Sequence, residues 1–544
     1  MFCNQCQETL KNEGCTQRGV CGKTDDVANL QDLMVHALRG VSFFQMLKRE
    51  EGKPDKESNE IIMESLFATI TNANFDRSRM IEYIKDSLRI RDRLREELEA
   101  GGHKFEDLPD HAIWTYENEE KALEKSKEIG HLSIEDENLR SLMLLILYGV
   151  KGISAYLHHA YVLGFTDEGI FKFMNRGLLA YRDPDMDLDG LLEMVIECGN
   201  TGVKTMALLD DANTSKYGIP SPHKVDLGVK KNPGILISGH DLKDLEELLE
   251  QTKGTGVDIY THGEMLPANY YPFFDKYDNL VGNYGGSWWY QIKDFETFNG
   301  PVLLTTNCLV PPLPSYKERV YTTGTVGFEG IPHIPDREPG KNKDFSQLIE
   351  HAKKCDPPQE LETGQIVGGF NHRTLWDLKD KVMDAVQSGK IKKFFVMAGC
   401  DGRHKTREYY TEFAKALPKE AVILTAGCAK YRYNKVVTDD IDGIPRVIDA
   451  GQCNDSFSLA TFAIKLADDL GVDPNEMPIE YNVAWYEQKA VLVLLSLLAL
   501  GVKNIHLGPT LPAFVSPSVL DVLVDKFQLA PNTTVEQDIA SMMA

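Results

Sequence analysis

Four cysteines stand within the first 21 residues of this 544-residue chain, with the spacing C-x2-C-x8-C-x5-C. Thiolates this close in sequence can converge on one centre without help from the rest of the chain, so they constrain how the first segment folds. Four cysteine ligands suit an iron–sulfur cluster and structural zinc about equally well. Disulfides or free thiols are the remaining alternative. The four residues are Cys3, Cys6, Cys15 and Cys21.

The composition is that of a multidomain globular protein. The length allows three or four domains, and 42% hydrophobic and 26% charged residues are ordinary proportions. The net charge of −23 argues against nucleic acid as a partner. Residues 1–20 lack the pattern of a secretory signal, and the longest strongly apolar run, residues 490–502, is too short to cross a bilayer.

We therefore expect a cytoplasmic protein with no membrane partner, and nothing in the sequence demands more than a monomer. Cytosolic thiols are kept reduced, so metal ligation is favoured over disulfides for the four cysteines.

Residues 27 to about 215 carry the apolar spacing of helices, as in Leu30, Leu33 and Leu38. A faint repeat relates this stretch to a second one 109 residues later. The matching residues of the second copy are Leu139, Leu142, Met143, Leu147, Gly149 and Val150. The repeat predicts two tandem helical bundles packed into one all-α domain.

After a Gly/Pro/Ser linker at residues 217–222 the pattern changes. Short apolar runs follow, each leading to a polar or glycine-containing turn and often to an amphipathic stretch. They lie at residues 234–238, 257–260, 302–306, 394–398, 422–425 and 447–450. Strands alternating with helices predict βαβ units and mostly parallel sheets.

A Pro-rich passage near residue 357 divides this half into two α/β domains. The predicted domains are residues 1–220, with the four-cysteine segment and the helices, residues 221–357, and residues 358–544.

Each of these predicted strands ends near a residue that can bind a metal. The residues are His240, Glu264, Cys308, Cys400, Cys428 and Cys453. Because ligands bind at the carboxyl ends of strands in open α/β sheets, we expect these side chains to share one region. Thiolates suit iron–sulfur chemistry, whereas carboxylate and imidazole suit a harder iron with oxygen ligands. The mixture predicts a catalytic cluster rather than an electron carrier.

Several segments together resemble the hybrid cluster proteins, or prismane proteins, the family of hydroxylamine reductases. They are MFCNQCQET at residues 1–9, AGCDG at 398–402, GQCND at 451–455 and WYEQKA at 485–490. The resemblance runs over essentially the full length, and the cysteine spacing is similar to the anaerobe-type branch. It implies an α-helical domain followed by two Rossmann-like α/β domains, a fold related to carbon monoxide dehydrogenases.

The resemblance also implies two cofactors. One 4Fe–4S cluster would be bound by Cys3, Cys6, Cys15 and Cys21. A hybrid 4Fe–2O–2S cluster at the domain interface would be bound by His240, Glu264, Cys308, Cys400, Cys428, Cys453 and Glu487. In the family, the cysteine that matches Cys400 can carry an extra persulfide sulfur. The strand pattern alone misses Glu487, because it opens a helix-like stretch.

The implied activity is the two-electron reduction of hydroxylamine to ammonia and water. We expect substrate to bind an open iron of the hybrid cluster. The expected catalytic residues are Glu487, His240, Glu264 and Lys489. The 4Fe–4S cluster would relay electrons from a separate donor protein, because the sequence has no nucleotide-binding fingerprint.

Three alternatives stay open. The same cluster would also suit nitric oxide reduction in nitrosative-stress defence. A non-catalytic redox or electron-transfer protein is a second alternative. A nickel-dependent carbon monoxide dehydrogenase is a weaker one, because such sites use more cysteine and no carboxylate.

Other candidate residues have simpler interpretations. Cys198 is expected in a helix core and Cys355 at the surface or in a linker. His158 and His159 lie in a helical segment without a thiolate nearby in sequence and are interpreted as structural. For His262, two residues before Glu264, two interpretations stay open: a structural role, or a place behind the ligands where it would orient or protonate them.

Overall fold

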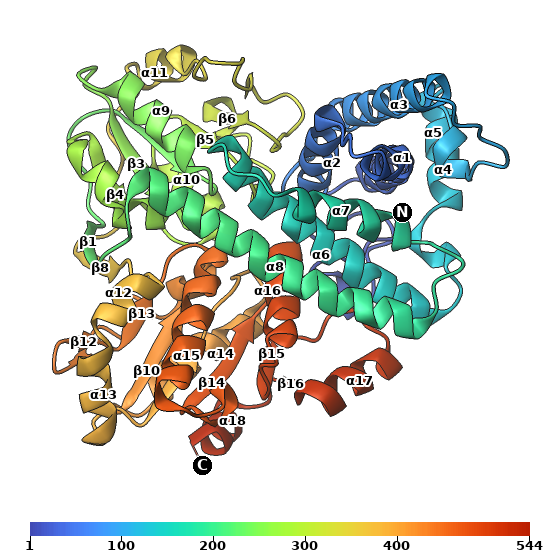
Figure 1. Ribbon diagram of the computed structural model, residues 1–544. Coiled ribbons are helices and arrows are strands. Elements are labelled where there is room, and N and C mark those ends of the chain that lie inside the picture. Colours follow the sequence, from blue (N-terminus) through green and yellow to red (C-terminus); the bar gives the residue numbers. More distant parts are fainter. Residues whose placement is uncertain (544) are drawn as a thin grey trace.

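The computed structural model describes residues 1–543, in which a helical region is followed by two parallel α/β sheets (Figure 1). Residues 1–24 precede the first α-helix. They contain a 3-10 turn, η1 (Leu10–Asn12), and an antiparallel bridge between Cys3 and Cys15. This segment is anchored far along the chain, because the Gln7 backbone N–H donates to the Tyr486 carbonyl oxygen at 2.9 Å.

The predicted helical region spans the next 190 residues or so. Its two copies of the sequence repeat lie in α1 (Asp25–Glu50) and α6 (Glu137–Val162), which are both 26 residues long. α1 packs on α3 (Arg77–Ala100), and α6 packs on α8 (Leu188–Tyr217) and on α2 (Lys56–Ala68). The other helical elements are α4 (Asp110–Ile113), α5 (Glu119–Glu128), η2 (His131–Ser133) and α7 (Glu168–Ala180).

Aspartates define where several of these helices begin. The side chains of Asp136, Asp167 and Asp187 accept hydrogen bonds from backbone N–H groups at the starts of α6, α7 and α8. Such caps satisfy N–H groups that have no partner within the helix.

α6 is the central helix of this region. By length and composition it is apolar enough to cross a membrane, but 94% of its apolar window is buried inside the molecule. It packs against α16 (Gln488–Ala499), which follows Glu487, and α8 packs against both of these helices. Glycines allow this close approach: a Cβ at Gly199 would lie 2.1 Å from the Leu495 carbonyl oxygen. α6 is therefore a core helix.

The first α/β domain contains a wholly parallel sheet with the strand order β4-β3-β2-β5-β6-β7. Every residue of β2 and β3 is buried, as expected when helices cover both faces of a sheet. The strands are β2 (Gly234–Ser238), β3 (Asp258–His262), β4 (Leu280–Asn283), β5 (Val302–Leu304), β6 (Val320–Thr323) and β7 (His333–Ile334). The helical elements are α9 (Leu242–Thr252), η3 (Gly263–Tyr270), η4 (Pro272–Lys276), η5 (Trp288–Tyr290), α10 (Gln291–Thr297), η6 (Lys317–Arg319) and α11 (Ser346–Ala352).

The second α/β domain repeats this plan with the order β13-β10-β9-β14-β15-β16, again parallel. The strands are β9 (Lys393–Val396), β10 (Ala421–Thr425), β13 (Val447–Asp449), β14 (Ile479–Ala484), β15 (Ile505–Gly508) and β16 (Ala530–Pro531). The helical elements are α12 (His372–Asp377), α13 (Lys379–Gln387), η7 (Lys405–Arg407), α14 (Glu408–Ala416), η8 (Cys428–Arg432), η9 (Cys453–Asp455), α15 (Ser456–Leu470), η10 (Pro474–Glu476), α16, α17 (Pro517–Phe527) and α18 (Val535–Met543). A short hairpin is formed by β11 (Asp440–Ile441) and β12 (Ile444–Pro445).

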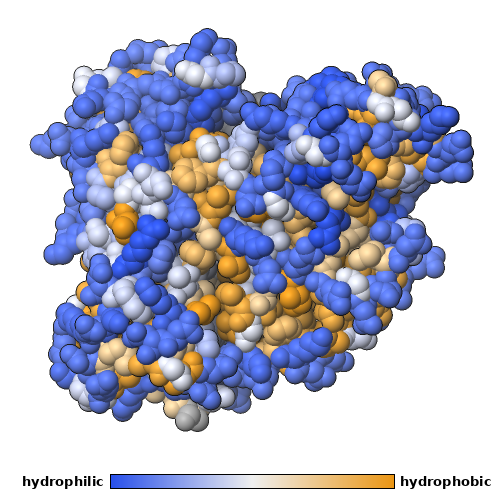
Figure 2. Space-filling view, in the orientation of Figure 1, coloured by the Kyte–Doolittle hydropathy of each residue, from blue (hydrophilic) through white to orange (hydrophobic). Residues whose placement is uncertain are grey.

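Counted along the chain within each domain, both strand orders read 3-2-1-4-5-6, the order of the Rossmann fold. The prediction of two Rossmann-like domains with parallel sheets is therefore confirmed. An antiparallel pair, β1 (His223–Asp226) with β8 (Gln365–Gly368), joins the start of the first α/β domain to the start of the second. In Figure 2 most of the surface is polar, and apolar residues gather over the middle of the face, along α8 and below it.

Candidate metal centre

Strands from both sheets end at one small cavity. β2, β3 and β5 lead to it from the first sheet, and β9, β10, β13 and β14 from the second. Sheets of this order bind ligands at this place, outside the carboxyl ends of the strands where the strand order reverses. The lining includes the seven residues expected at the hybrid cluster: His240, Glu264, Cys308, Cys400, Cys428, Cys453 and Glu487.

Gly399 and Gly427 turn the chain just before Cys400 and Cys428. Both glycines have positive φ, +112° and +87°. A Cβ at Gly399 would lie 2.0 Å from the Ala484 carbonyl oxygen, and one at Gly427 would lie 2.4 Å from the Gly399 carbonyl oxygen. Since only glycine fits there, these turns bring the ends of neighbouring strands, and the thiols that follow them, close together.

His240 presents one ring nitrogen to the cavity. Its Nδ1 is hydrogen-bonded to Thr306 Oγ1 at 2.8 Å. Its Nε2 lies 3.0 Å from Lys489 Nζ, 3.6 Å from Glu264 Oε2 and 3.7 Å from Cys453 Sγ. Burial lowers the pKa of His240 well below its usual value, so the ring is neutral. A neutral imidazole fixed through Nδ1 is suited to bind a metal through Nε2.

Glu264 has one carboxylate oxygen in use and one free. Its Oε2 accepts a hydrogen bond from the Cys453 backbone N–H at 2.9 Å. Its Oε1 is buried and has no hydrogen-bond partner among the described residues. The Gln452 side chain holds this part of the chain by donating to the carbonyl oxygens of His240 and Glu264 at 3.1 and 2.8 Å. A buried carboxylate oxygen without a partner fits a metal ligand.

Cys428 and Cys453 are buried, Cys308 and Cys400 are partly buried, and removal from water favours the neutral form of a thiol. Burial raises the pKa of Cys400 to about 12, and the neighbouring charge of Glu487 also raises it. Burial and the charge of Glu264 raise the pKa of Cys428 well above its usual value. Without a metal these thiols are therefore protonated, whereas a bound metal ion favours thiolates. Thiolates, one imidazole and two carboxylates are a donor set that fits a cluster with sulfide and oxo parts.

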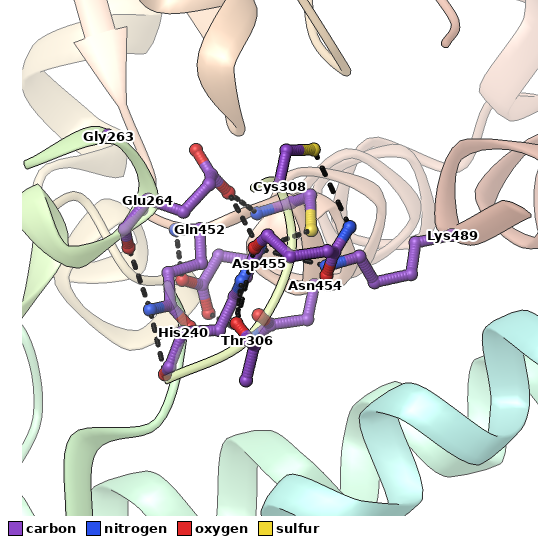
Figure 3. A network of polar contacts seen from close by, with 12 residues as sticks. His240, Gly263, Glu264, Thr306, Cys308, Gln452, Asn454, Asp455 and Lys489 are labelled. Atoms are coloured by element: carbon purple, nitrogen blue, oxygen red, sulfur yellow. Dashed lines mark hydrogen bonds and ion pairs between the residues drawn. The ribbon is translucent and has the colours of Figure 1, made fainter. Parts of the chain in front are cut away.

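Lys489 lies in the cavity wall within a network of polar contacts (Figure 3). Its Nζ donates to Asn307 Oδ1 at 2.8 Å and lies 3.6 Å from Glu487 Oε1. The Asn307 side chain donates in turn to Glu487 Oε1 at 3.3 Å. Glu487 also caps α16, because its Oε2 accepts from the Lys489 backbone N–H at 2.8 Å. Lys489 is the only lysine among the described residues that line this cavity. Its ammonium group lies between the His240 imidazole and the Glu487 carboxylate.

Some residues of this site were not found from the sequence. Asn307 and Gln452 were missed, although each immediately precedes a predicted cysteine ligand. Trp288, which also lines the cavity, comes from η5 and had no signal in the strand pattern. Glu487 does follow a strand, β14. The first three residues of this strand are only partly buried and include Glu480 and Tyr481, so the strand did not show in the sequence as an apolar run.

The four N-terminal cysteines form a second group. Cys3 and Cys15 face each other through two backbone hydrogen bonds of 3.0 and 2.8 Å. Burial raises the pKa of Cys6, and the charges of Cys21 and Cys3 raise it further. The structure thus pairs the chain at Cys3 with the chain at Cys15, and the convergence of all four thiols on one cluster stays a prediction.

Tyr486 lies between the two groups of cysteines. It is buried, its ring is 4.7 Å from that of Trp288 on the cavity side, and its carbonyl oxygen binds the Gln7 N–H. The neighbouring Gln488 side chain donates to the Gln5 carbonyl oxygen at 2.5 Å. The residues around Glu487 therefore touch the N-terminal segment directly.

The histidines outside the predicted ligand set have two different surroundings. His262 is fully buried between Ser238 Oγ at 3.1 Å and Asp294 Oδ2 at 3.2 Å, and Ser238 lines the cavity. This places it behind the cavity wall. The ring of His159 stacks on that of His240, with centroids 5.8 Å apart and planes 19° apart. Helix α6 thus brings a histidine next to the candidate site that the sequence did not connect with it.

The two remaining cysteines lie apart from both groups. Cys198 is buried in α8, and a Cβ at Gly149 of α6 would lie 2.3 Å from its Sγ, so the thiol fills the space between these helices. Cys355 follows α11 and is partly exposed.

The fold and the site define a class of protein: a helical domain and two Rossmann-like domains arranged around a buried centre of thiol, imidazole and carboxylate donors. The family model described as Prismane/CO dehydrogenase family matches residues 1–540, and this chain belongs to that family. Membership implies iron–sulfur clusters.

Curated relatives match over the full length. A protein named hydroxylamine reductase from Natranaerobius thermophilus is 59% identical over 100% of this chain and 99% of its own. One of the same name from Caldanaerobacter subterraneus subsp. tengcongensis is 60% identical over 99% and 98%, and one from Methanosarcina mazei is 58% identical over 100% of both chains.

Solved structures share the fold at low identity. Carbon monoxide dehydrogenase IV from Carboxydothermus hydrogenoformans has a TM-score of 0.55 and 16% identity, covering 99% of this chain and 92% of that one. A nickel-free carbon monoxide dehydrogenase from Thermococcus sp. AM4 has a TM-score of 0.53 and 16% identity, covering 99% and 90%. The expected relation of the fold to carbon monoxide dehydrogenases is confirmed.

Proposed function

We propose that this protein is a hydroxylamine reductase, which converts hydroxylamine, two electrons and two protons into ammonia and water. Relatives that are 58–60% identical over the full length carry this name. The observation that carries the proposal is the mixed set of buried donors where strands of both sheets end. A pure electron carrier needs no such mixture of soft and hard ligands.

In this proposal Cys3, Cys6, Cys15 and Cys21 hold a 4Fe–4S cluster. The hybrid 4Fe–2O–2S cluster is held by His240, Glu264, Cys308, Cys400 (with or without a persulfide), Cys428, Cys453 and Glu487. The Glu264 Oε1 without a hydrogen-bond partner and the His240 ring held through Nδ1 support this assignment. When bound, the hybrid cluster would supply electrons and an iron Lewis acid that weakens the N–O bond.

Lys489 is the proton donor that we assign. Burial opposes its charge, but the neighbouring Cys453 and Glu487 raise its pKa, so Nζ keeps its proton. Asn307 fixes the ammonium group at the cavity wall, within reach of a small substrate. From there Nζ can protonate the leaving hydroxide, and Glu487 stabilises the charged form of the lysine between turnovers.

Electrons would arrive from a separate donor protein through the N-terminal cluster. Cys3 is the partly exposed member of the first group of cysteines, and Tyr486 lies on the inner side. The arrangement supports one-electron relay from the surface to the cavity.

Parallel anaerobic kinetics with hydroxylamine and nitric oxide test the substrate. One artificial electron donor is used for both, and rates are normalised to iron content. We expect the higher kcat/KM with hydroxylamine. A much higher kcat/KM with nitric oxide would instead make the protein a nitric oxide reductase, and no turnover of either substrate would favour the non-catalytic alternative.

Replacing Lys489 tests the proton donor. Lys489→Met should lower kcat for hydroxylamine by about 100-fold or more, because a positioned acid contributes roughly 10²–10⁴-fold. Lys489→Arg, which keeps the charge but holds its proton more tightly, is the matched control and should retain the cluster spectrum while remaining slow. Wild-type kcat in Lys489→Met with full iron content would contradict the assignment.

A further inference from the structure

A second group of metal-binding side chains lies behind His240. It consists of His158 and His159, on α6, and Asp241, at the start of α9. One ligand atom of each residue lies within 4.8 Å of the others. The ligand atoms of His240, Glu264 and Cys453, three of the residues assigned to the hybrid cluster, also lie within 4.8 Å of one another. The group therefore has the geometry of a site for a single ion.

The imidazoles of this group have unused nitrogens. Nδ1 of His158 and both ring nitrogens of His159 are buried and have no hydrogen-bond partner among the described residues. The two rings stand edge-on to Phe67, with centroids 5.4 and 5.5 Å from its ring, so one wall of the group is apolar. Buried polar atoms are rarely left without a partner in native proteins, and each such atom calls for a ligand.

Asp241 supplies the carboxylate of the group. Its Oδ1 accepts hydrogen bonds from the backbone N–H groups of Lys243 and Asp244 at 2.9 and 3.0 Å at the start of α9. The nearby cations Arg337 and Lys343 pair with Asp244 at 2.7 and 3.0 Å rather than with Asp241.

We propose that His158, His159 and Asp241 form a binding site for a divalent transition-metal ion of the zinc type. Two imidazoles and one carboxylate are a set of protein ligands that zinc sites use, with water in the fourth position. Ligand atoms around a tetrahedral zinc ion stand about 3.4 Å apart, so side-chain movements of roughly an ångström close the site. Because imidazole and carboxylate replace thiolate, the site differs in chemistry from the iron–sulfur centres.

The ion would lie next to the hybrid site without sharing its ligands. His159 stacks on the ring of His240, and Asp241 follows His240 directly in the chain. The inference does not depend on the proposed substrate, because it concerns residues outside the cavity lining.

Zinc binding to the holoprotein tests the site. The protein is treated anaerobically with EDTA, then titrated with Zn²⁺ in competition with a chromophoric chelator, and bound zinc is counted by mass spectrometry after gel filtration. We expect one tight equivalent per chain in the wild type and at least about tenfold weaker binding in His158→Ala. Iron and sulfide contents should not change, since His158 is not in the cavity lining.

His103→Ala is the matched control, because His103 pairs with Glu51 on the surface and should leave zinc binding unchanged. His158→Gln serves if His158→Ala does not fold. Anomalous diffraction at the zinc edge from a zinc-soaked crystal should place the ion between the three side chains. Equal zinc affinity in wild type and both His158 variants, or an anomalous peak elsewhere, would overturn the proposal.

Discussion

Burial favours the neutral form of the imidazole and of the thiols in the candidate centre. The same burial that makes His240 neutral keeps Cys308 and Cys428 protonated while no metal is bound. In such surroundings a thiol becomes a strong ligand only by losing its proton to a metal. Metal uptake by this site is therefore coupled to proton release.

This coupling predicts how the metal-free protein responds to pH. The cavity thiols keep protons in the folded state that an unfolded chain loses near pH 9. Their contribution to folding stability is therefore full below about pH 9 and is lost as the pH rises toward the folded pKa values. We expect the urea midpoint of the metal-free protein to fall between about pH 8 and about pH 10. Metal-bound thiolates do not titrate there, so the holoprotein should change less. An equal fall of the urea midpoint with pH in the metal-free protein and in the holoprotein would contradict this prediction.

Replacing Glu487 separates the two centres. Glu487→Ala removes a predicted cluster ligand and the carboxylate beside Lys489, so hydroxylamine turnover should fall by about 100-fold or more. The N-terminal 4Fe–4S signal in electron paramagnetic resonance should remain. The control is Glu480→Ala, on the strand that precedes Glu487, where the carboxylate pairs with Lys393 near the surface. Full turnover in Glu487→Ala would remove this residue from the site.

At the scale of elements, the position of α16 decides where Glu487 lies. α16 fits between α6 and α8 because glycines face it: a Cβ at Gly152 would lie 2.8 Å from the Gln488 carbonyl oxygen, and a Cβ at Gly202 would lie 2.5 Å from Ser496 Oγ. The helical domain thus supports the second α/β domain at the end of α16 that carries the candidate ligand.

Filling one of these contacts should displace α16. Gly199→Ala places a methyl group against the Leu495 carbonyl oxygen, and overpacking of this kind costs about 1–3 kcal/mol. We expect a lower urea midpoint and less iron per chain, because α16 begins directly after Glu487. In Gly130→Ala, the control, the nearest atom would lie at an ordinary 3.6 Å. If both variants retain iron equally, the helix contact does not position the site.

Much of this arrangement was predictable from the sequence. β2, β9 and β10 are short buried apolar runs, and a general rule of parallel sheets then places the residues after them together. β14 was not predicted, because its first residues are half exposed. The stacking of His159 on His240 and the hydrogen bonds of Asn307 depend on packing between distant segments, which has no local pattern.

At the scale of the whole molecule, the first and last parts of the chain meet. The N-terminal segment binds Tyr486 and also Arg403, whose side chain pairs with buried Glu8 at 2.9 Å. The four-cysteine centre is therefore attached to the second α/β domain rather than free at the end of the chain.

Removing one N-terminal thiol should uncouple the centres without unfolding the protein. Cys15→Ser should lower the iron content by about half, because the proposed assignment gives the protein two four-iron clusters and Cys15 binds one of them. The hybrid-cluster signal should persist, and turnover with a protein donor should fall more than turnover with a small reductant. Cys355→Ser, at a partly exposed thiol away from both centres, is the control. Unchanged iron in Cys15→Ser would contradict the assignment of the first centre.

The convergence of both sheets on one cavity has a consequence for biosynthesis. The N-terminal thiols leave the ribosome first, whereas Glu487 emerges only when most of the 544 residues have been made. In the proposed assignment the first cluster needs ligands from the N-terminal segment alone, whereas the second needs ligands from both Rossmann-like domains and from the start of α16. We therefore expect the second cluster to be inserted only after Glu487 has been made, and a ribosome-bound chain that stops short of β14 to carry at most the first cluster.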